Sequence, residues 1–160
     1  MPASKAARRG NADTTSASAA FVHRNLPLLL LQAREQLMRR FRPILNAHGI
    51  TEQQWRIVRA LLDVDGLEPR QIGEICGISS PSLVGILERM EDFGFVARDR
   101  VAHDQRRVRV TLTRKSKKLA ERMAPDVEAE YQRMEEELGR ELLARLYGDL
   151  DAILLTSGQG

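Results

Sequence analysis

The fold is decided by residues 69–113, which read PRQIGEICGISSPSLVGILERMEDFGFVARDRVAHDQRRVRVTLT. Ile72, Ile75 and Cys76 recur at spacings of three and four, and this period predicts the buried face of a short helix. Gly77 follows, and a glycine in the left-handed region commonly ends a helix. The start of this segment is therefore interpreted as one short helix and a tight turn.

A second helix is expected directly after this turn. The hydroxyls of Ser79 and Ser80 are suited to cap its start, and Pro81 is suited to the first helical position. Its apolar residues recur at i, i+4 and i+7 and predict a buried face: Leu83, Leu87 and Met90. The opposite face carries small or hydrogen-bonding groups: Pro81, Ser82, Gly85, Glu88 and Arg89.

Gly85 lies inside this second helix, where a glycine costs about 1 kcal/mol relative to alanine. Close approach of another molecule to that face would justify the cost. Packing of Gly85 against the two-stranded wing that is expected to follow this helix is the alternative.

A two-stranded ribbon is expected after the second helix. Val108, Val110 and Leu112 alternate with Arg109 and Thr111, and a period of two predicts a half-buried strand. Residues 98–118 contain nine Lys or Arg and two Asp, a local excess of +7. An isolated charge run usually marks a solvated face, but one on a ribbon directly after a helix-turn-helix indicates contacts with phosphates and grooves.

Residues 21–47 predict a long helix with an unusually broad apolar surface, which suggests more than one packing partner. Contact with a second subunit is the interpretation that we favour, and burial in the chain's own core is the alternative. Thr51 is expected to cap the next helix. The apolar stripe of that helix is expected at three positions: Trp55, Val58 and Leu62. Residues 63–67 predict a turn that leads into a short third strand at Leu67 and Glu68.

From residue 114 the apolar spacing predicts a long helix. A kink is expected near residues 121–125, because Pro125 removes one backbone donor. Gly139 is expected to break the run before a last helix that ends near residue 155.

These patterns predict a mostly α protein with a small β-wing (α+β), a winged helix-turn-helix flanked by long dimerisation helices. The expected parts are a disordered tail at residues 1–20, a dimerisation helix at 21–47 and a DNA-binding domain at 48–113. Dimerisation helices at 114–155 and a frayed end at 156–160 would follow.

Charge and composition narrow the class of protein. Residues 119–160 hold ten acids and four bases, whereas the whole chain has a net charge of +3. The residues before 119 are therefore strongly basic, and a basic part next to an acidic part indicates a nucleic-acid partner. Cys76 is the single cysteine, and no apolar run approaches the ~20 residues of a membrane span. A cytoplasmic protein without a membrane partner is expected. Three scattered histidines and no Gly-rich phosphate loop argue against an enzyme, a metal site or a cofactor.

The wing segment HDQRRVRVTLT, residues 103–113, resembles the Asp-x-Arg-x-x-x-Val-x-Leu-Thr signature of MarR-type transcriptional regulators. The stretches NLPLLLLQARE, residues 25–35, and TEQQWR, residues 51–56, are similar to the branch that controls aromatic-acid catabolism, including homoprotocatechuate and hydroxynicotinate degradation. The family usually has Asp-Pro before the wing tip, where this chain has Val101 and Ala102. The resemblance implies a homodimeric repressor that binds double-stranded DNA.

The second of the two short helices is expected to be the recognition helix and to lie in the major groove. Ser80, Ser82 and Arg89 would then lie near the bases, with Pro81 beside them. For Ser80, a helix cap is an equal alternative. The resemblance implies that Arg106 enters the minor groove while Asp104 orients its guanidinium; a surface ion pair is the alternative. The candidates for phosphate contact are Arg107, Arg109 and Lys115.

The resemblance also implies a small aromatic acid as effector. Trp55 matches a pocket tryptophan of salicylate-responsive members, although an ordinary core position is at least as well supported. Arg34 and Arg59 are candidates for a two-pronged bond to a carboxylate, and His23 and His48 are weaker candidates. A protein-interaction module and a regulator without a ligand remain alternatives, and Cys76 is expected to be a buried, inert thiol.

Overall fold

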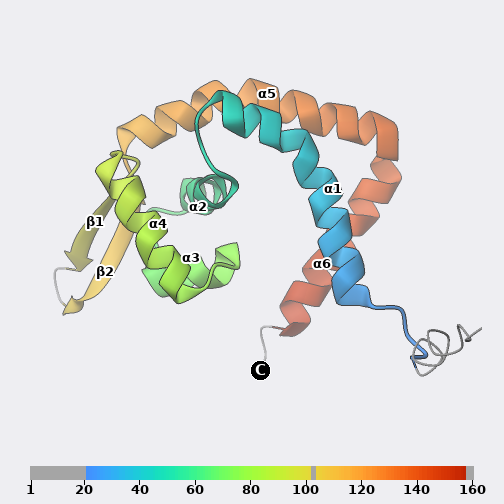
Figure 1. Ribbon diagram of the computed structural model, residues 1–160, viewed down its shortest axis with the longest axis horizontal. Helices are drawn as coiled ribbons and strands as arrows, with labels where there is room; N and C mark the ends of the chain where they lie inside the picture. The colour runs from blue at the N-terminus through green and yellow to red at the C-terminus, as the bar shows by residue number, and fades with distance from the viewer. Residues whose placement is uncertain (1–20, 102–103, 158–160) are drawn as a thin grey trace, which may run out of the picture. The chain divides into compact units, whose positions relative to one another are not determined.

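The structure is a computed structural model that describes residues 21–101 and 104–157 (Figure 1). Its elements are α1 (Leu26–Ala47), α2 (Glu52–Leu62), α3 (Pro69–Cys76), α4 (Ser80–Asp92), β1 (Val96–Val101), β2 (Asp104–Leu112), α5 (Arg114–Leu138) and α6 (Arg140–Ser157). The predicted fold class is confirmed, because these residues are mostly helical with one small antiparallel sheet. The chain divides into two compact units, residues 1–37 and 38–160, and the division falls within α1.

In the first unit, α1 begins at Leu26, so the expected start at Phe21 is wrong. Asn25 ends the preceding segment, because its side-chain Oδ1 accepts a hydrogen bond from the Leu28 N–H at 3.1 Å and its carbonyl accepts from Leu29. Pro27 suits the first turn, where its missing N–H costs no helix bond. The first turns of α1 expose their apolar side chains: Leu26, Leu28, Leu29, Leu30 and Leu31.

In the second unit, α2, α3 and α4 contact one another and enclose the core of the helix-turn-helix. The predicted face of α4 is confirmed, since Leu83, Leu87 and Met90 are all buried, together with Ile86. Gly77 ends α3 with φ 60°, and its N–H bonds the Gly73 carbonyl, as its sequence position indicates.

Two of the predicted buried stripes need correction. On α3, Ile72 and Cys76 are buried but Ile75 is 62% exposed, because the face that meets α2 and α4 is centred on the i, i+4 pair. On α2, Trp55 is only half-buried and Leu62 is exposed. The buried positions of α2 are Gln54, Ile57, Val58 and Leu61. The start of α2 is as expected, since Thr51 forms a capping box with Gln54.

The wing is a two-stranded antiparallel sheet with Val96 opposite Leu112 and Arg100 opposite Val108. The register shifts between Arg100 and Val101, and the tip residues 102–103 lie outside the described residues. The expected third strand is reduced to a single bridge, in which Leu67 and Val110 exchange two backbone hydrogen bonds of 3.0 and 2.8 Å. This bridge joins the loop before α3 to the inner strand of the wing.

A polar joint connects the wing to α5. Thr113 caps α5 and donates its hydroxyl to the Gly94 carbonyl at 2.6 Å. Ser116 is fully buried and donates to the Phe95 carbonyl at 2.6 Å. The two hydroxyls therefore attach the start of α5 to the turn between α4 and β1.

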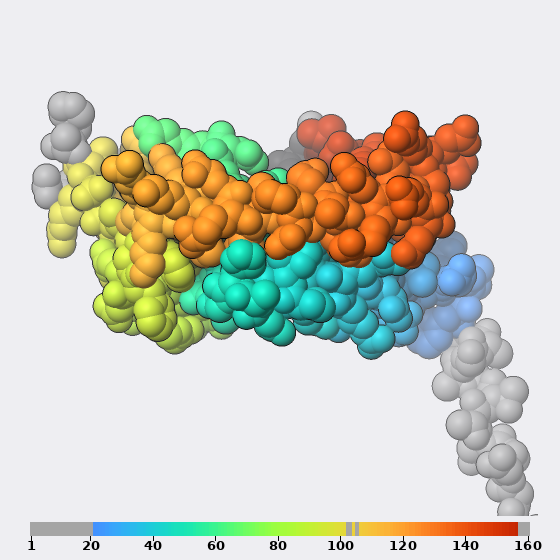
Figure 2. Space-filling model, turned by 90° about the horizontal axis from the view of Figure 1, so that it is seen from above, coloured from blue at the N-terminus to red at the C-terminus, as the bar shows by residue number. Residues whose placement is uncertain are grey.

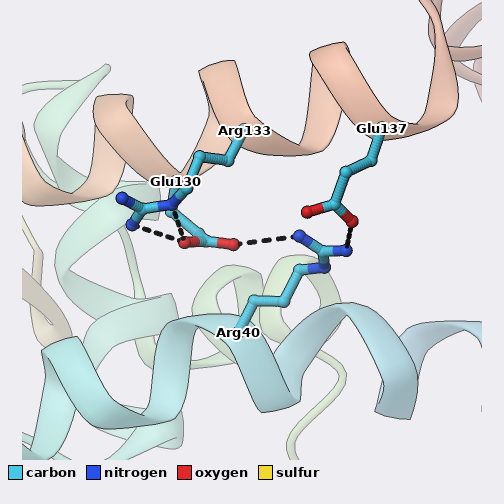
Figure 3. Close-up of polar contacts among 4 residues, drawn as sticks. All are labelled: Arg40, Glu130, Arg133 and Glu137. Carbon is cyan, nitrogen blue, oxygen red and sulfur yellow. Dashed lines mark hydrogen bonds and ion pairs between the residues drawn. The ribbon is translucent and has the colours of Figure 1, made fainter.

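α5 packs against the last turns of α1 within the second unit, and Figure 2 shows their surfaces directly side by side. Phe41 and Tyr131 contact each other with ring centroids 4.9 Å apart. Beside them the buried Glu130 accepts hydrogen bonds from Arg40 and Arg133, and Arg40 also pairs with Glu137 (Figure 3). A buried carboxylate needs such partners, because an unpaired charge would be costly to desolvate.

The C-terminal helices agree with the sequence in one respect and differ in another. Gly139, with φ 86°, separates α5 from α6 as predicted. α5 continues through Pro125 as one helix, and a kink near residues 121–125 stays a prediction. Thr156 and Ser157 belong to α6, so the helix passes the expected end at residue 155. The expected tail at residues 1–20 and the last residues 158–160 lie outside the described residues.

The contrast between Ile72 and Ile75 gives a test of the α3 packing. We expect Ile72→Ala to lower the free energy of unfolding by about 2–5 kcal/mol, because it removes a fully buried side chain. Ile75→Ala, the same change three residues away, should stay within about 0.5 kcal/mol. Urea unfolding followed by circular dichroism measures both, and equal losses would contradict the described orientation of α3.

Candidate nucleic-acid interface

The outward face of α4 presents small and polar groups at its start. Ser80, Pro81 and Ser82 are all exposed in the first turn, and Arg89 is exposed near the end. Ser79 is the N-cap residue, so the alternative role of Ser80 as the cap is wrong. The Ser79 hydroxyl donates to the Ser82 hydroxyl at 3.1 Å, which ties one polar group of this face to the turn before it.

Gly85 keeps the middle of the outward face low. A Cβ added there would meet only the Arg89 Nη1 atom, at 3.4 Å, among atoms within 4 Å. Packing against the wing is therefore not what the glycine allows, and that alternative is wrong. The missing Cβ leaves the helix backbone uncovered at this position, and close approach of another molecule stays a prediction.

Val84 also belongs to this face, although it was not among the residues predicted for it from the sequence. Its side chain is 55% exposed one residue before Gly85. The signal was present in the sequence, because Val84 falls between the buried positions 83 and 87 and outside their i, i+4 spacing.

The basic residues of the wing base have acidic or carbonyl partners. Arg107 Nε donates to Glu68 Oε1 at 2.8 Å, and Arg107 Nη2 donates to the same oxygen. Arg109 Nη2 lies 3.7 Å from Asp65 Oδ2. The hydrogen bond to Glu68 raises the pKa of Arg107 above its usual value, and the negative charge of Glu68 adds to this shift.

Lys115 and Arg98 are also engaged with their neighbours. Lys115 Nζ donates to the Phe93 carbonyl at 2.6 Å and lies 5.0 Å from the centre of the Phe95 ring. Arg98 Nε donates to Glu91 at 2.7 Å, and this hydrogen bond lowers the pKa of that carboxyl. Lys115 thus helps to hold the turn after α4, a role that its place in a charge run did not indicate.

Arg106 and Asp104 lie at the base of the wing tip. Asp104 Oδ1 accepts a hydrogen bond from the Arg106 backbone N–H at 3.0 Å, and the orientation of the Arg106 guanidinium by Asp104 stays a prediction. The Arg106 side chain is exposed. The carboxylate therefore shapes the turn from which Arg106 projects.

Comparisons with known proteins identify the family. A family model described as "MarR family" matches residues 48–107. The HTH-type transcriptional regulator FarR of Neisseria gonorrhoeae is 44% identical over 124 residues, which cover 78% of this chain and 85% of FarR. The homoprotocatechuate degradative operon repressor of Escherichia coli is 39% identical over 125 residues, 78% of this chain and 84% of the repressor.

The fold comparison agrees. The crystal structure of NadR in complex with 4-hydroxyphenylacetate superposes with a TM-score of 0.75 at 44% identity, covering 84% of this chain and 94% of NadR. The chain belongs to the MarR family. It is accordingly a DNA-binding transcriptional regulator with a winged helix-turn-helix, as the wing signature at residues 103–113 indicated.

The five effector candidates of this MarR-family protein are divided between the two units. His23 and Arg34 belong to the first unit, and His48, Trp55 and Arg59 belong to the second. Trp55 and Arg59 are four residues apart on one side of α2, and the positive charge of Arg59 acts on Tyr131 of α5. His48 lies 3.8 Å from Asp126.

A hollow of about 380 Å³ lies where α1 ends and α2 begins. It is lined by Arg42, Leu45, Asn46, Gly49, Ile50, Thr51 and Glu52. The candidates Trp55, Arg59 and His48 are not among these lining residues, so the hollow does not coincide with the predicted effector site.

Cys76 is buried at the end of α3, as expected. Burial raises the pKa of its thiol, and the charge of Arg56 opposes that shift. The Arg56 guanidinium donates to the Cys76 carbonyl and so caps the end of α3. A thiol in this environment is a poor nucleophile at neutral pH.

Metal-binding groups and membrane-spanning helices were searched for among the described residues. Among the described residues, no group of three His, Cys, Asp or Glu side chains could hold a metal ion. Over the same part of the chain, none of the helices combines the length and apolarity needed to span a bilayer.

Proposed function

We propose that this protein is a dimeric repressor that binds a pseudo-palindromic operator and leaves it when a small aromatic carboxylic acid binds. The observation that carries the DNA-binding part is the low, polar face of α4 beside a wing that presents Arg106, Arg107 and Arg109. A helix face of this kind fits the major groove, and the wing cations suit the adjacent phosphates and minor groove.

Base recognition is assigned to the outward face of α4. Ser80, Ser82 and Arg89 offer hydrogen-bonding groups, and Val84 offers an apolar group suited to a thymine methyl. Because serines discriminate weakly between bases, part of the sequence preference is assigned to the shape of the groove that receives Arg106.

The dimer rests on apolar surface that a single chain leaves exposed. The early turns of α1 expose a run of leucines, and α6 exposes Tyr147, Leu154 and Leu155 at more than half of their surface. Apolar surface of this extent is unusual on a monomer and typical of an interface. A two-fold dimer would place two α4 helices about one DNA turn apart, roughly 34 Å.

The effector site is assigned to the side of α2 that carries Trp55 and Arg59. A half-buried indole offers a face for an aromatic ring, and a guanidinium four residues later offers two donors for a carboxylate. NadR, which is 44% identical, has been crystallised in complex with a phenolic acid, 4-hydroxyphenylacetate. His48, which lies in the same unit, remains a candidate for a further contact, and the roles of Arg34 and His23 of the first unit stay predictions. Release would follow if the acid bound better to a spacing of the α4 helices that does not fit the operator.

Arg106→Ala tests the wing. On a duplex selected by the protein from a random-sequence pool, we expect a loss of about 1–3 kcal/mol in binding free energy and a salt slope smaller by about one unit. Fluorescence anisotropy at several salt concentrations measures both. Arg122→Ala on α5 removes an exposed arginine elsewhere and is the control. Unchanged affinity in Arg106→Ala would contradict the assignment of the wing to DNA.

Arg59→Ala tests the effector site, with 4-hydroxyphenylacetate, benzoate and nicotinate as probes. The chain has a single tryptophan, so quenching of Trp55 fluorescence reports binding. We expect the acid that quenches Trp55 and releases the selected duplex to bind Arg59→Ala more weakly by about 1.5–3 kcal/mol, the usual loss of a charged hydrogen bond. DNA affinity without acid should not change. An acid that releases DNA equally from both proteins would place the site elsewhere.

A further inference from the structure

Two carboxylates lie directly beside the arginines at the base of the wing, and neither was among the candidate site residues. Glu68 receives two hydrogen bonds from Arg107 on one oxygen, and Asp65 lies 3.7 Å from Arg109. Both acids belong to the loop between α2 and α3, while both arginines belong to β2. The acids thus neutralise, in the free protein, two of the cations assigned to DNA.

The backbone brings these pairs together. Leu67, between the two acids, exchanges two hydrogen bonds with Val110 of β2. Gly66 has φ 98°, and a Cβ there would lie 2.4 Å from Arg109 Nε. The missing side chain therefore leaves the space through which the Arg109 side chain passes on its way to Asp65.

The pairs are open to solvent and therefore exchangeable. The side chain of Arg107 is 57% exposed and that of Glu68 33% exposed, while Asp65 is almost fully exposed. Ion pairs at such positions are weak, because water and salt screen them. A DNA phosphate can replace the carboxylate on the same guanidinium, since Arg binds both groups through the same two-pronged geometry.

We propose that Glu68 and Asp65 compete with DNA phosphates for Arg107 and Arg109. The two carboxylates hold these arginines in the free protein and so limit its affinity for DNA of any sequence. The inference rests on the proposed DNA-binding function. A phosphate contact releases a counterion from the DNA and makes affinity fall with salt. Each vacated carboxylate takes up a cation in return, so the exchange offsets part of that release.

Glu68→Gln is the first test, because glutamine keeps an oxygen for the capping box of α3 and removes only the charge. We expect its affinity for a duplex unrelated to the selected one to rise about two- to fivefold at low salt. This rise corresponds to the usual strength of an exposed ion pair, which DNA would no longer have to break. The salt slope should become steeper by up to about one unit. Arg107→Ala in the same background should remove the gain.

Glu135→Gln is the matched control, because Glu135 pairs with Arg140 at 2.9 Å, has a similar exposure and lies at the junction of α5 and α6. It removes the same charge and should change affinity and slope much less than Glu68→Gln. Asp65→Asn serves as a second variant, since Asp65 is exposed outside the helices and its loss does not threaten the fold. It should show a smaller gain in the same direction.

The outcomes separate the two ideas. If the wild-type protein binds DNA but neither Glu68→Gln nor Asp65→Asn gains more than Glu135→Gln, the competition is refuted and the proposed function stands. If the wild-type protein binds neither the selected nor the unrelated duplex at low salt, both fall together. A gain in affinity without a steeper salt slope also refutes the competition, because exchange at phosphates requires both.

Discussion

Two backbone hydrogen bonds between Leu67 and Val110 hold the wing against the helix-turn-helix, and the arrangement of the DNA-binding face depends on them. Val110 is fully buried in the core, so its strand is held in position by apolar packing as well as by the bridge. With Val110 turned inward, the strand period of two turns Arg107 and Arg109 outward. Thr113 and Ser116, which follow this strand, donate their hydroxyls to the Gly94 and Phe95 carbonyls and so fix the start of α5 to the turn between α4 and β1. The recognition helix and the wing therefore form one body that can approach DNA together.

The features that could be predicted from the sequence are those with a cause a few residues away. Helix ends with a strong local cause were predicted correctly, as at Gly77, Gly139 and Thr51, because a left-handed glycine or a capping hydroxyl acts within a few residues. The faces of short helices were less certain. Ile72 and Ile75 look alike in the sequence, and only the positions of α2 and α4 decide that one is buried and the other is exposed. The same limit applies to α2. Trp55 and Leu62 were predicted to be buried, but the buried stripe is shifted by one position to Gln54, Ile57 and Leu61.

The candidate site shows a similar limit. The charge run at residues 98–118 correctly located the basic wing, because charge density is a local property of the sequence. It could not reveal that Glu68 pairs with Arg107 across 39 positions or that Lys115 holds the Phe93 carbonyl. Those contacts depend on the bridge at Leu67 and on the turn after α4. The roles of individual cations therefore followed only from the folded arrangement.

We infer that α4 and the wing contact the same duplex as a single body and that a two-fold dimer repeats that contact. Dimethyl sulfate footprinting of the full chain on its selected duplex tests this inference, because the reagent methylates guanine N7 in the major groove and adenine N3 in the minor groove. We expect protection at a major-groove segment and at the minor groove beside it, repeated about one helical turn away with two-fold symmetry. Protection at a single unrepeated segment, or in the major groove without the adjacent minor groove, would contradict it.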